Sequence, residues 1–146
     1  MKIYFDTGLL LKLYSFEPNS VLAIALIQSH GTPIILSGLQ ETELRNALYR
    51  KRTRREMTPA QLKKALKDLQ GDLDGGVLHI PRLDWPEVWA NANRLTAKYV
   101  LTTSCRTLDI LHVAIALQLS VDIFGTTNQR QLLLARKAGL KTVTLG

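Results

Sequence analysis

The chain has 146 residues, a formal net charge of +7 and a hydrophobic content of 46%. This length predicts one domain over residues 1–146, able to bury about 68% of its unfolded surface without covalent support. The single cysteine, Cys105, excludes an internal disulfide and a zinc site built from cysteines. The sequence shows no signal-peptide pattern and no bilayer-length apolar run, so we expect a cytoplasmic protein without a membrane partner.

Short apolar runs alternate with helical patterns, which indicates an α/β fold. Strands are expected at residues 2–6, 33–36, 77–80, 121–124 and 142–145. Helices are expected at residues 9–15, 19–29, 38–54, 59–71, 85–101, 105–119 and 129–138. Thr58, Asp84, Ser104 and Asn128 are suited to begin helices as N-caps, and Gly139 to end one. This order predicts a parallel sheet with the strand at residues 2–6 in its centre.

Polar residues follow two of the expected strands. Asp6 ends the first apolar run, and Asn128 comes shortly after the fourth strand. In open parallel sheets, ligands bind beyond the carboxyl ends of the strands, so both residues are candidates for one site. Each has an alternative role as the cap of the helix that follows it. A phosphatase that also begins with a strand-end aspartate needs a second aspartate at the position of Gly8, which disfavours that interpretation.

Two glutamates compete in the expected helix at residues 38–54. Because a helix turns 100° per residue, Glu41 and Glu43 point to different faces. Glu41 lies one turn before Arg45, in the favourable order for an ion pair, and is interpreted as structural. Glu43 shares a stripe with Leu39 and Ala47 that we expect to face inward, where a carboxylate requires a partner. Glu43 is therefore the candidate for the site.

Asp109 lies in a helix that is apolar on nearly every side and is expected to be buried. A lone charge in such a helix requires a cation, either a metal ion or the side chain of Arg106. His112 lies three residues later on the same face. It is interpreted as a core histidine bonded to Asp109 or to the backbone, ahead of a metal ligand. Trp85 and Trp89, one turn apart, are expected to be core or dimer contacts.

Nine of the nineteen basic residues fall within residues 45–67, where only Glu56 opposes them. Such a cluster attracts phosphate backbones through counterion release, although an ordinary solvated helix face has the same composition. Arg50 and Arg52 are the candidates for binding nucleic acid. Thr126 and Thr127 are candidates for holding a water at the metal or the scissile phosphate.

Together these residues form four ordered motifs across nearly the whole chain. The motifs are Tyr4–Tyr14 with Glu17-Pro18 behind it, Glu43–Leu48, Arg106–Ala114, and Phe124–Arg130 followed by Ala138-Gly139-Leu140. In this pattern the sequence resembles the PIN-domain ribonucleases, and among them the VapC-type toxins of bacterial and archaeal toxin–antitoxin pairs. The third motif is the most specific of the four.

The resemblance implies a three-layer α/β/α sandwich around a parallel sheet, usually dimeric, with Mg²⁺- or Mn²⁺-dependent cleavage of RNA. It also implies inhibition by a small antitoxin protein. By this resemblance Asp6, Glu43 and Asp109 bind the metal, with Asn128 in the place where the family often has a fourth aspartate. Gly8 stands where the family often has serine, which removes a hydroxyl near the metal. Three carboxylates and one amide give a less negative site.

The expected function is that of a metal-dependent endoribonuclease, with Asp6 and Asp109 holding the cation and Glu43 holding it or orienting the water. Oxygen ligands of this kind suit Mg²⁺ or Mn²⁺. The alternative is a PIN module with little catalysis that binds RNA or an antitoxin. Metal-dependent cleavage of RNA by the pure protein separates the two hypotheses.

Overall fold

The computed structural model describes residues 1–31 and 33–145 and divides the chain into two compact units. Unit 1 comprises Met1–Asp6 and Arg82–Gly146, and unit 2 comprises Thr7–Pro81. All strand pairs in both units are parallel, and helices separate the strands along the chain, so the α/β class with parallel strands is confirmed. No helix among the described residues is long and apolar enough to cross a membrane.

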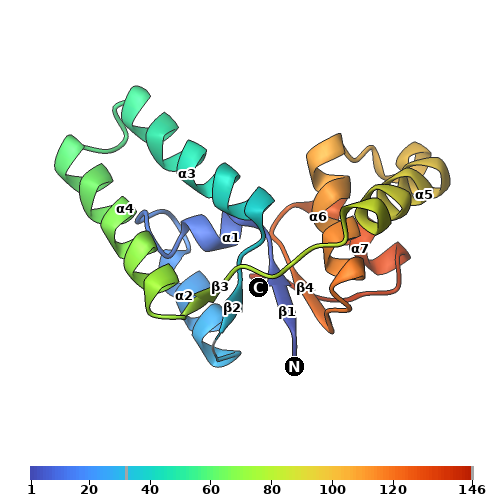
Figure 1. Cartoon of the computed structure of the whole chain (residues 1–146). Helices are drawn as coiled ribbons and strands as arrows, with labels where there is room; N and C mark the ends of the chain where they lie inside the picture. Colours follow the sequence, from blue (N-terminus) through green and yellow to red (C-terminus); the bar gives the residue numbers. More distant parts are fainter. Residues whose placement is uncertain (32, 146) are drawn as a thin grey trace. The chain divides into compact units, whose positions relative to one another are not determined.

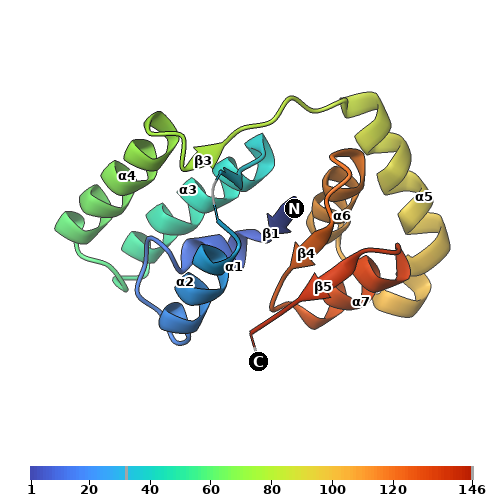
Figure 2. The ribbon, with the colours of Figure 1, turned by 90° about the horizontal axis from the view of Figure 1, so that it is seen from below.

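Unit 1 contains a three-stranded parallel sheet in the order β1-β4-β5 (Figures 1 and 2). Its strands are β1 Ile3–Phe5, β4 Ile123–Gly125 and β5 Lys141–Val143. Its helices are α5 Trp85–Thr103, α6 Thr107–Gln118 and α7 Gln129–Lys137. The register aligns Phe5 with Gly125 and Gly125 with Val143, so the carboxyl ends of all three strands lie at one edge. Residues that directly follow β1 and β4 are therefore neighbours.

Aromatic packing holds the first two strands of this sheet together. Tyr4 and Phe124 are fully buried, and their rings stack with centroids 5.5 Å apart. Gly125 allows the close approach of Phe5, because a Cβ at Gly125 would lie 2.6 Å from Cδ1 of the Phe5 ring. The edge that carries Asp6 is thus set by tightly packed side chains on both strands.

Unit 2 consists of helices around a two-stranded parallel sheet of β2 Ile34–Ile35 and β3 Leu78–His79. Its helices are α1 Thr7–Leu11, α2 Ser20–Ser29, α3 Gly38–Thr53 and α4 Pro59–Asp74. Helices α3 and α4 run side by side as a hairpin, and both begin with a capping box (Figure 1). The box of α4 is formed by Thr58 and Gln61, and Thr58 begins the helix as the sequence predicted.

Three predictions about the elements were wrong. The strand at residues 2–6 is not central in its sheet, because β4 pairs with both β1 and β5. The helix expected at residues 9–15 begins at Thr7 and ends at Leu11, and turns follow it. Ser104 does not cap α6: it ends α5 in the left-handed conformation, with φ of 57°, and Arg106 is the N-cap residue of α6.

The two tryptophans of α5 are not core residues. Trp85 is 40% exposed and Trp89 is 50% exposed, and their rings lie 5.5 Å apart. The α5 positions that face the interior are taken by smaller side chains, including Val88, Ala92 and Leu95. The interpretation of the tryptophans as dimer contacts stays a prediction.

Candidate functional site

Asp6 lies at the carboxyl end of β1, where its backbone N–H donates to Gly125 O at 2.8 Å and extends the pairing with β4. Its residue is only 7% exposed. A carboxylate at this depth costs free energy unless hydrogen bonds or a cation compensate it. The placement of Asp6 and of the β4 loop at one edge of the sheet confirms the expectation from the strand ends.

Thr126, directly after β4, provides part of this compensation. Its side chain is fully buried, and Oγ1 lies 2.5 Å from Asp6 Oδ2, to which it donates. The same oxygen accepts the backbone N–H of Asn128 at 3.0 Å. In this structure the Thr126 hydroxyl is therefore directed at the acid, and its predicted role in binding RNA stays a prediction. Thr127 is exposed beside it.

Gln131 of α7 continues this network and was missed by the sequence analysis. It is 2% exposed, and Oε1 lies 2.9 Å from Thr126 Oγ1. Its Nε2 lies 3.4 Å from the backbone carbonyl oxygen of Asp109. The inner stripe of α7 was the available signal, since Gln131 stands one turn before Leu134 and Ala135, which are both buried.

Asp109 is half-buried in the first turn of α6, a more exposed position than the apolar helix predicted. Its Oδ2 accepts the backbone N–H of Arg106 at 3.1 Å, which closes the helix start. Among the described residues, no ion pair joins Asp109 to Arg106, and the Arg106 residue is exposed. The structural alternative for Asp109 is thus a helix cap, and this bond also orients its carboxylate.

Asn128 is the N-cap of α7, as one of its two interpretations predicted. Its Oδ1 accepts the backbone N–H groups of Arg130 at 3.0 Å and Gln131 at 3.2 Å. An amide oxygen has two lone pairs, so these bonds occupy both. Its role as a metal ligand stays a prediction, and it requires one of these bonds to be given up.

His112 is a buried core histidine, 4% exposed, as interpreted from the sequence. Its Nδ1 lies 2.7 Å from the Tyr4 hydroxyl, a contact that the sequence did not predict. Tyr4 lies 108 residues away in the chain, which no local pattern reveals. The bond connects α6, which carries Asp109, to β1, the strand directly before Asp6.

Glu43 belongs to unit 2, where it is half-buried on α3. Its Oε1 accepts the Thr7 hydroxyl at 2.8 Å, so the carboxylate has the partner that its stripe required. The most buried stripe of α3 is instead Gln40, Leu44 and Leu48, which places Glu43 on its flank. Glu41 forms the predicted ion pair, with its Oε2 at 2.9 Å from Arg45 Nε.

The basic cluster of residues 45–67 covers the end of α3 and the start of α4 in unit 2. Arg50 and Arg54 are exposed, Arg52 is half-buried, and Lys51 pairs with Glu17 at 3.3 Å. Arg50, Lys51 and Arg52 occupy the last turn of α3, where positive charge also stabilises the helix end. This structural role explains the position of the charges, and the predicted contact with RNA stays a prediction.

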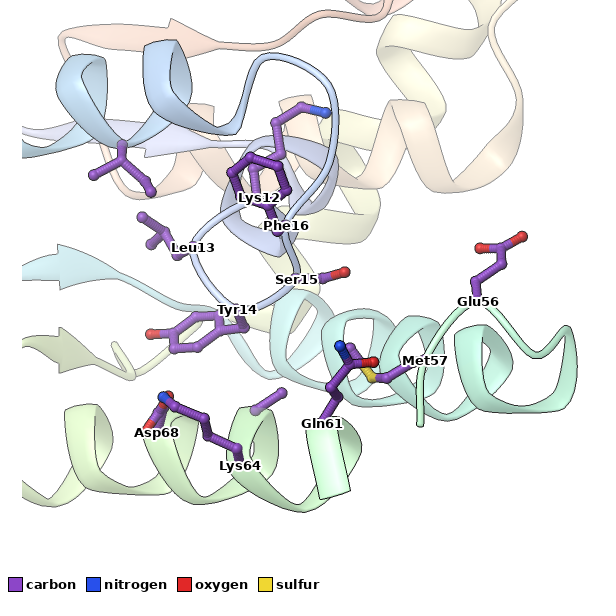
Figure 3. A pocket seen from close by; sticks show the side chains of 12 residues that line it. Lys12, Leu13, Tyr14, Ser15, Phe16, Glu56, Met57, Gln61, Lys64 and Asp68 are labelled. Atoms are coloured by element: carbon purple, nitrogen blue, oxygen red, sulfur yellow. The ribbon is translucent and has the colours of Figure 1, made fainter. Parts of the chain in front are cut away.

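A pocket of about 320 Å³ lies within unit 2 between the loop after α1 and helix α4 (Figure 3). Two of its charges pair with each other, with Lys64 Nζ 2.5 Å from Asp68 Oδ2. The Tyr14 hydroxyl donates to Asp72 at 2.6 Å, and burial together with this carboxylate raises the pKa of Tyr14. The bond between Tyr14 and Asp72 ties the loop to α4, so the pocket wall is a structural contact.

The donor chemistry at the edge of unit 1 fits a hard cation. Asp6 and Asp109 offer carboxylate oxygens, and each is oriented by a hydrogen bond at its own Oδ2. Residues 1–31 and 33–145 contain no group of three or more His, Cys, Asp or Glu side chains arranged to hold a metal ion. Since Glu43 belongs to the other unit, the site of three acids stays a prediction.

The chain shares its fold with a solved structure described as the crystal structure of FitAcB from Neisseria gonorrhoeae. The two align with a TM-score of 0.67 and 18% sequence identity, over 96% of this chain and 95% of that one. No protein-family model matches the chain, and no curated protein matches it significantly. The likeness shows a PIN-like α/β fold.

Proposed function

We propose that this chain is a Mg²⁺- or Mn²⁺-dependent endoribonuclease that acts through Asp6, Glu43 and Asp109. The observation that carries the proposal is the buried Asp6 carboxylate at the carboxyl end of β1, held by the buried Thr126. Apolar residues at these positions cost less free energy of folding, so a polar pair there is best explained by a ligand. The PIN-like fold agrees with the family that the four motifs resemble.

In the proposed mechanism Asp6 and Asp109 would hold the cation. The carboxylate of each is oriented by the hydrogen bond that its Oδ2 accepts. The bound cation supplies Lewis-acid activation of a water and of the phosphodiester. Glu43 is proposed to complete the ligands or to orient the water. Its anchor Thr7 is the next residue after Asp6 in the chain, which supports this assignment.

RNA is the proposed substrate, and Arg50, Arg52 and Thr127 are proposed to contact it. Arg50 is exposed and Arg52 is half-buried at the end of α3, and their positive charge suits a phosphate backbone. A small antitoxin protein is the proposed partner, and a homodimer is the proposed assembly. We infer that the chain is the toxin of a toxin–antitoxin pair.

Cleavage of end-labelled RNA by the pure protein, with Mn²⁺ or with a chelator, tests the proposal. We expect Asp6→Asn and Asp109→Asn to lower the rate by at least about 100-fold. Asp122→Asn is the matched control, because this exposed aspartate of the same unit bonds only the backbone of Lys2 in the described contacts, and its rate should be unchanged. Cleavage that survives the chelator, or that survives both site variants, contradicts the proposal.

The stability of the metal-free protein separates a ligand from a structural acid. Asn at position 109 keeps an oxygen for the Arg106 N–H and removes the charge. We therefore expect the free energy of unfolding of Asp109→Asn, measured by denaturant in chelator, to stay unchanged or to rise. A loss of about 3–5 kcal/mol instead indicates that a charge-dependent structural contact was broken.

One observation favours the alternative of a PIN module with little catalysis. Both lone pairs of the Asn128 amide oxygen are engaged in the cap of α7, and no fourth acid stands there. Binding of RNA without cleavage at any concentration of Mg²⁺ or Mn²⁺ supports this alternative.

A further inference from the structure

Gln131 is a buried polar residue on an otherwise apolar helix face. It is 2% exposed, and its neighbours on the inner side of α7 are Leu132, Leu134 and Ala135. Burying an amide without full hydrogen bonding costs about 1–3 kcal/mol in proteins, whereas methionine or leucine at the same place carries no such cost. Folding alone therefore does not explain a glutamine at this position.

The two ends of the Gln131 amide contact groups beside the two candidate acids Asp6 and Asp109. Oε1 lies 2.9 Å from Thr126 Oγ1, whose hydroxyl also contacts Asp6 Oδ2 at 2.5 Å. Nε2 lies 3.4 Å from the carbonyl oxygen of Asp109 itself. The Gln131 side chain thus connects two parts of the site. One is the loop after β4, in which Thr126 bonds Asp6, and the other is the first turn of α6, in which Asp109 lies.

The hydroxyl of Thr126 has one proton and two oxygen acceptors, Asp6 Oδ2 and Gln131 Oε1. The shorter contact is with Asp6, and the Asn128 N–H supplies a donor to the same oxygen. One proton cannot serve both acceptors at once, so Gln131 Oε1 competes with Asp6 for it and acts through its 2.9 Å contact, which holds the Thr126 oxygen beside Asp6. Mutation of residues that orient metal ligands in this way typically lowers metal affinity by about 10–100-fold.

We propose that Gln131 is a positioning residue of the acid site, which fixes Thr126 against Asp6 and sets the separation of Asp6 from Asp109. This inference rests on the proposed function, because it assigns Gln131 a role only if the two acids bind a cation. Gln131 does not touch the cation in this account, and it acts through Thr126 and through the backbone of α6.

The test is Gln131→Met, which keeps the length of the side chain and removes both polar atoms. The variant leaves Thr126 bonded to Asp6 and to Asn128, so no buried polar group there loses all of its partners. Two quantities are measured on the full chain: Mn²⁺ affinity by titration calorimetry, and the free energy of unfolding in chelator. We expect the dissociation constant for Mn²⁺ to rise roughly tenfold while the metal-free protein is as stable as wild type or more stable.

Gln118→Met is the matched control, because Gln118 stands at the other end of α6, where its Oε1 accepts the Asp84 N–H. It should leave Mn²⁺ affinity unchanged. Should Gln131→Met fail to fold, Gln131→Leu carries the same expectation. An unchanged Mn²⁺ affinity together with lower stability overturns the inference, since that is the result of a purely structural glutamine.

A double-mutant cycle tests the route through Thr126. Thr126→Val removes the hydroxyl and Thr126→Ser keeps it, so only the valine variant should weaken Mn²⁺ binding. Gln131→Met should then raise the dissociation constant for Mn²⁺ by a smaller factor in the Thr126→Val variant than in wild type. Equal factors in the two backgrounds contradict the proposed route. If wild type itself does not bind Mn²⁺, the proposed function fails. If wild type binds Mn²⁺ and Gln131→Met binds it equally well, only this inference is overturned.

Discussion

The polar residues of the two units are held in opposite ways. In unit 1, Asp6, Thr126 and Gln131 are each less than 8% exposed and are joined by hydrogen bonds. In unit 2, the charges of α3 and α4 are exposed or half-buried, and Glu41 pairs with Arg45 as Lys64 does with Asp68, each within one helix. A buried polar network depends on every member, while an exposed charge is worth little by itself. We therefore expect steep effects of substitution in the first and graded, salt-dependent effects in the second.

Glu43 is the residue of unit 2 that we assign to the acid site. Its substitution should therefore have the largest effect on RNA cleavage in that unit. We expect Glu43→Gln to lower RNA cleavage by about 100-fold, because it removes a carboxylate assigned to the cation. Glu41→Gln is the matched control on the same helix, since Glu41 pairs with Arg45, and its rate should stay within a few-fold of wild type. Equal rates for the two variants, measured with end-labelled RNA, remove Glu43 from the site.

The arginines of α3 should show the graded behaviour. Replacing Arg50, Arg52 and Arg54 with alanine should weaken RNA binding and make the plot of log affinity against log salt shallower. If each arginine contacts one phosphate, the slope should fall by about 2, because each contact with a single strand contributes about 0.7. Filter binding over a range of salt concentrations measures this slope. An unchanged slope assigns the cluster to a solvated helix end or to a protein partner.

Packing at the edge of unit 1 can be broken without touching a polar group. In Gly125→Ala the new Cβ would lie 2.6 Å from the Phe5 ring, which is fixed in the core, so we expect a loss of about 1–3 kcal/mol in the free energy of unfolding. Gly38→Ala is the control, because its Cβ meets no atom within 4 Å. A denaturant melt that shows equal stability for both variants contradicts the tight packing behind Asp6.

Asn128→Asp gives the smallest expected effect and probes the cap. Aspartate also caps helices well, so α7 should be as stable as in wild type, while the added charge should tighten Mn²⁺ binding several-fold. Titration calorimetry measures the change. An unchanged affinity leaves Asn128 with the cap as its only role and the site with three acids.

Local features were predictable from the sequence because their causes are local. The caps at Thr58, Asp84 and Asn128 were all predicted, since each depends on a side chain and a backbone N–H two or three residues ahead. The ion pair of Glu41 with Arg45 follows from the helical repeat in the same way. The parallel pairing followed from strands separated by helices.

What the sequence did not reveal depends on distant parts of the chain. The position of β4 between β1 and β5 is decided by packing across the unit, which strand patterns do not encode. The bond between His112 and Tyr4 spans 108 residues. Asp109 was expected to be buried because its helix is apolar as a whole, but the first turn lies at the rim and is half-buried. For the proposed site, the acids and Thr126 were candidates from the sequence, whereas the contact of Gln131 with Thr126 was not predicted.

We propose above all that Asp6 and Asp109 bind a divalent cation, with Glu43 as a further ligand or as the residue that orients the water. Anomalous diffraction at the manganese edge, from crystals grown with Mn²⁺, measures the position of the cation. We expect an anomalous peak within bonding distance of carboxylate oxygens from both Asp6 and Asp109. A peak that contacts neither of these two residues would contradict the proposal.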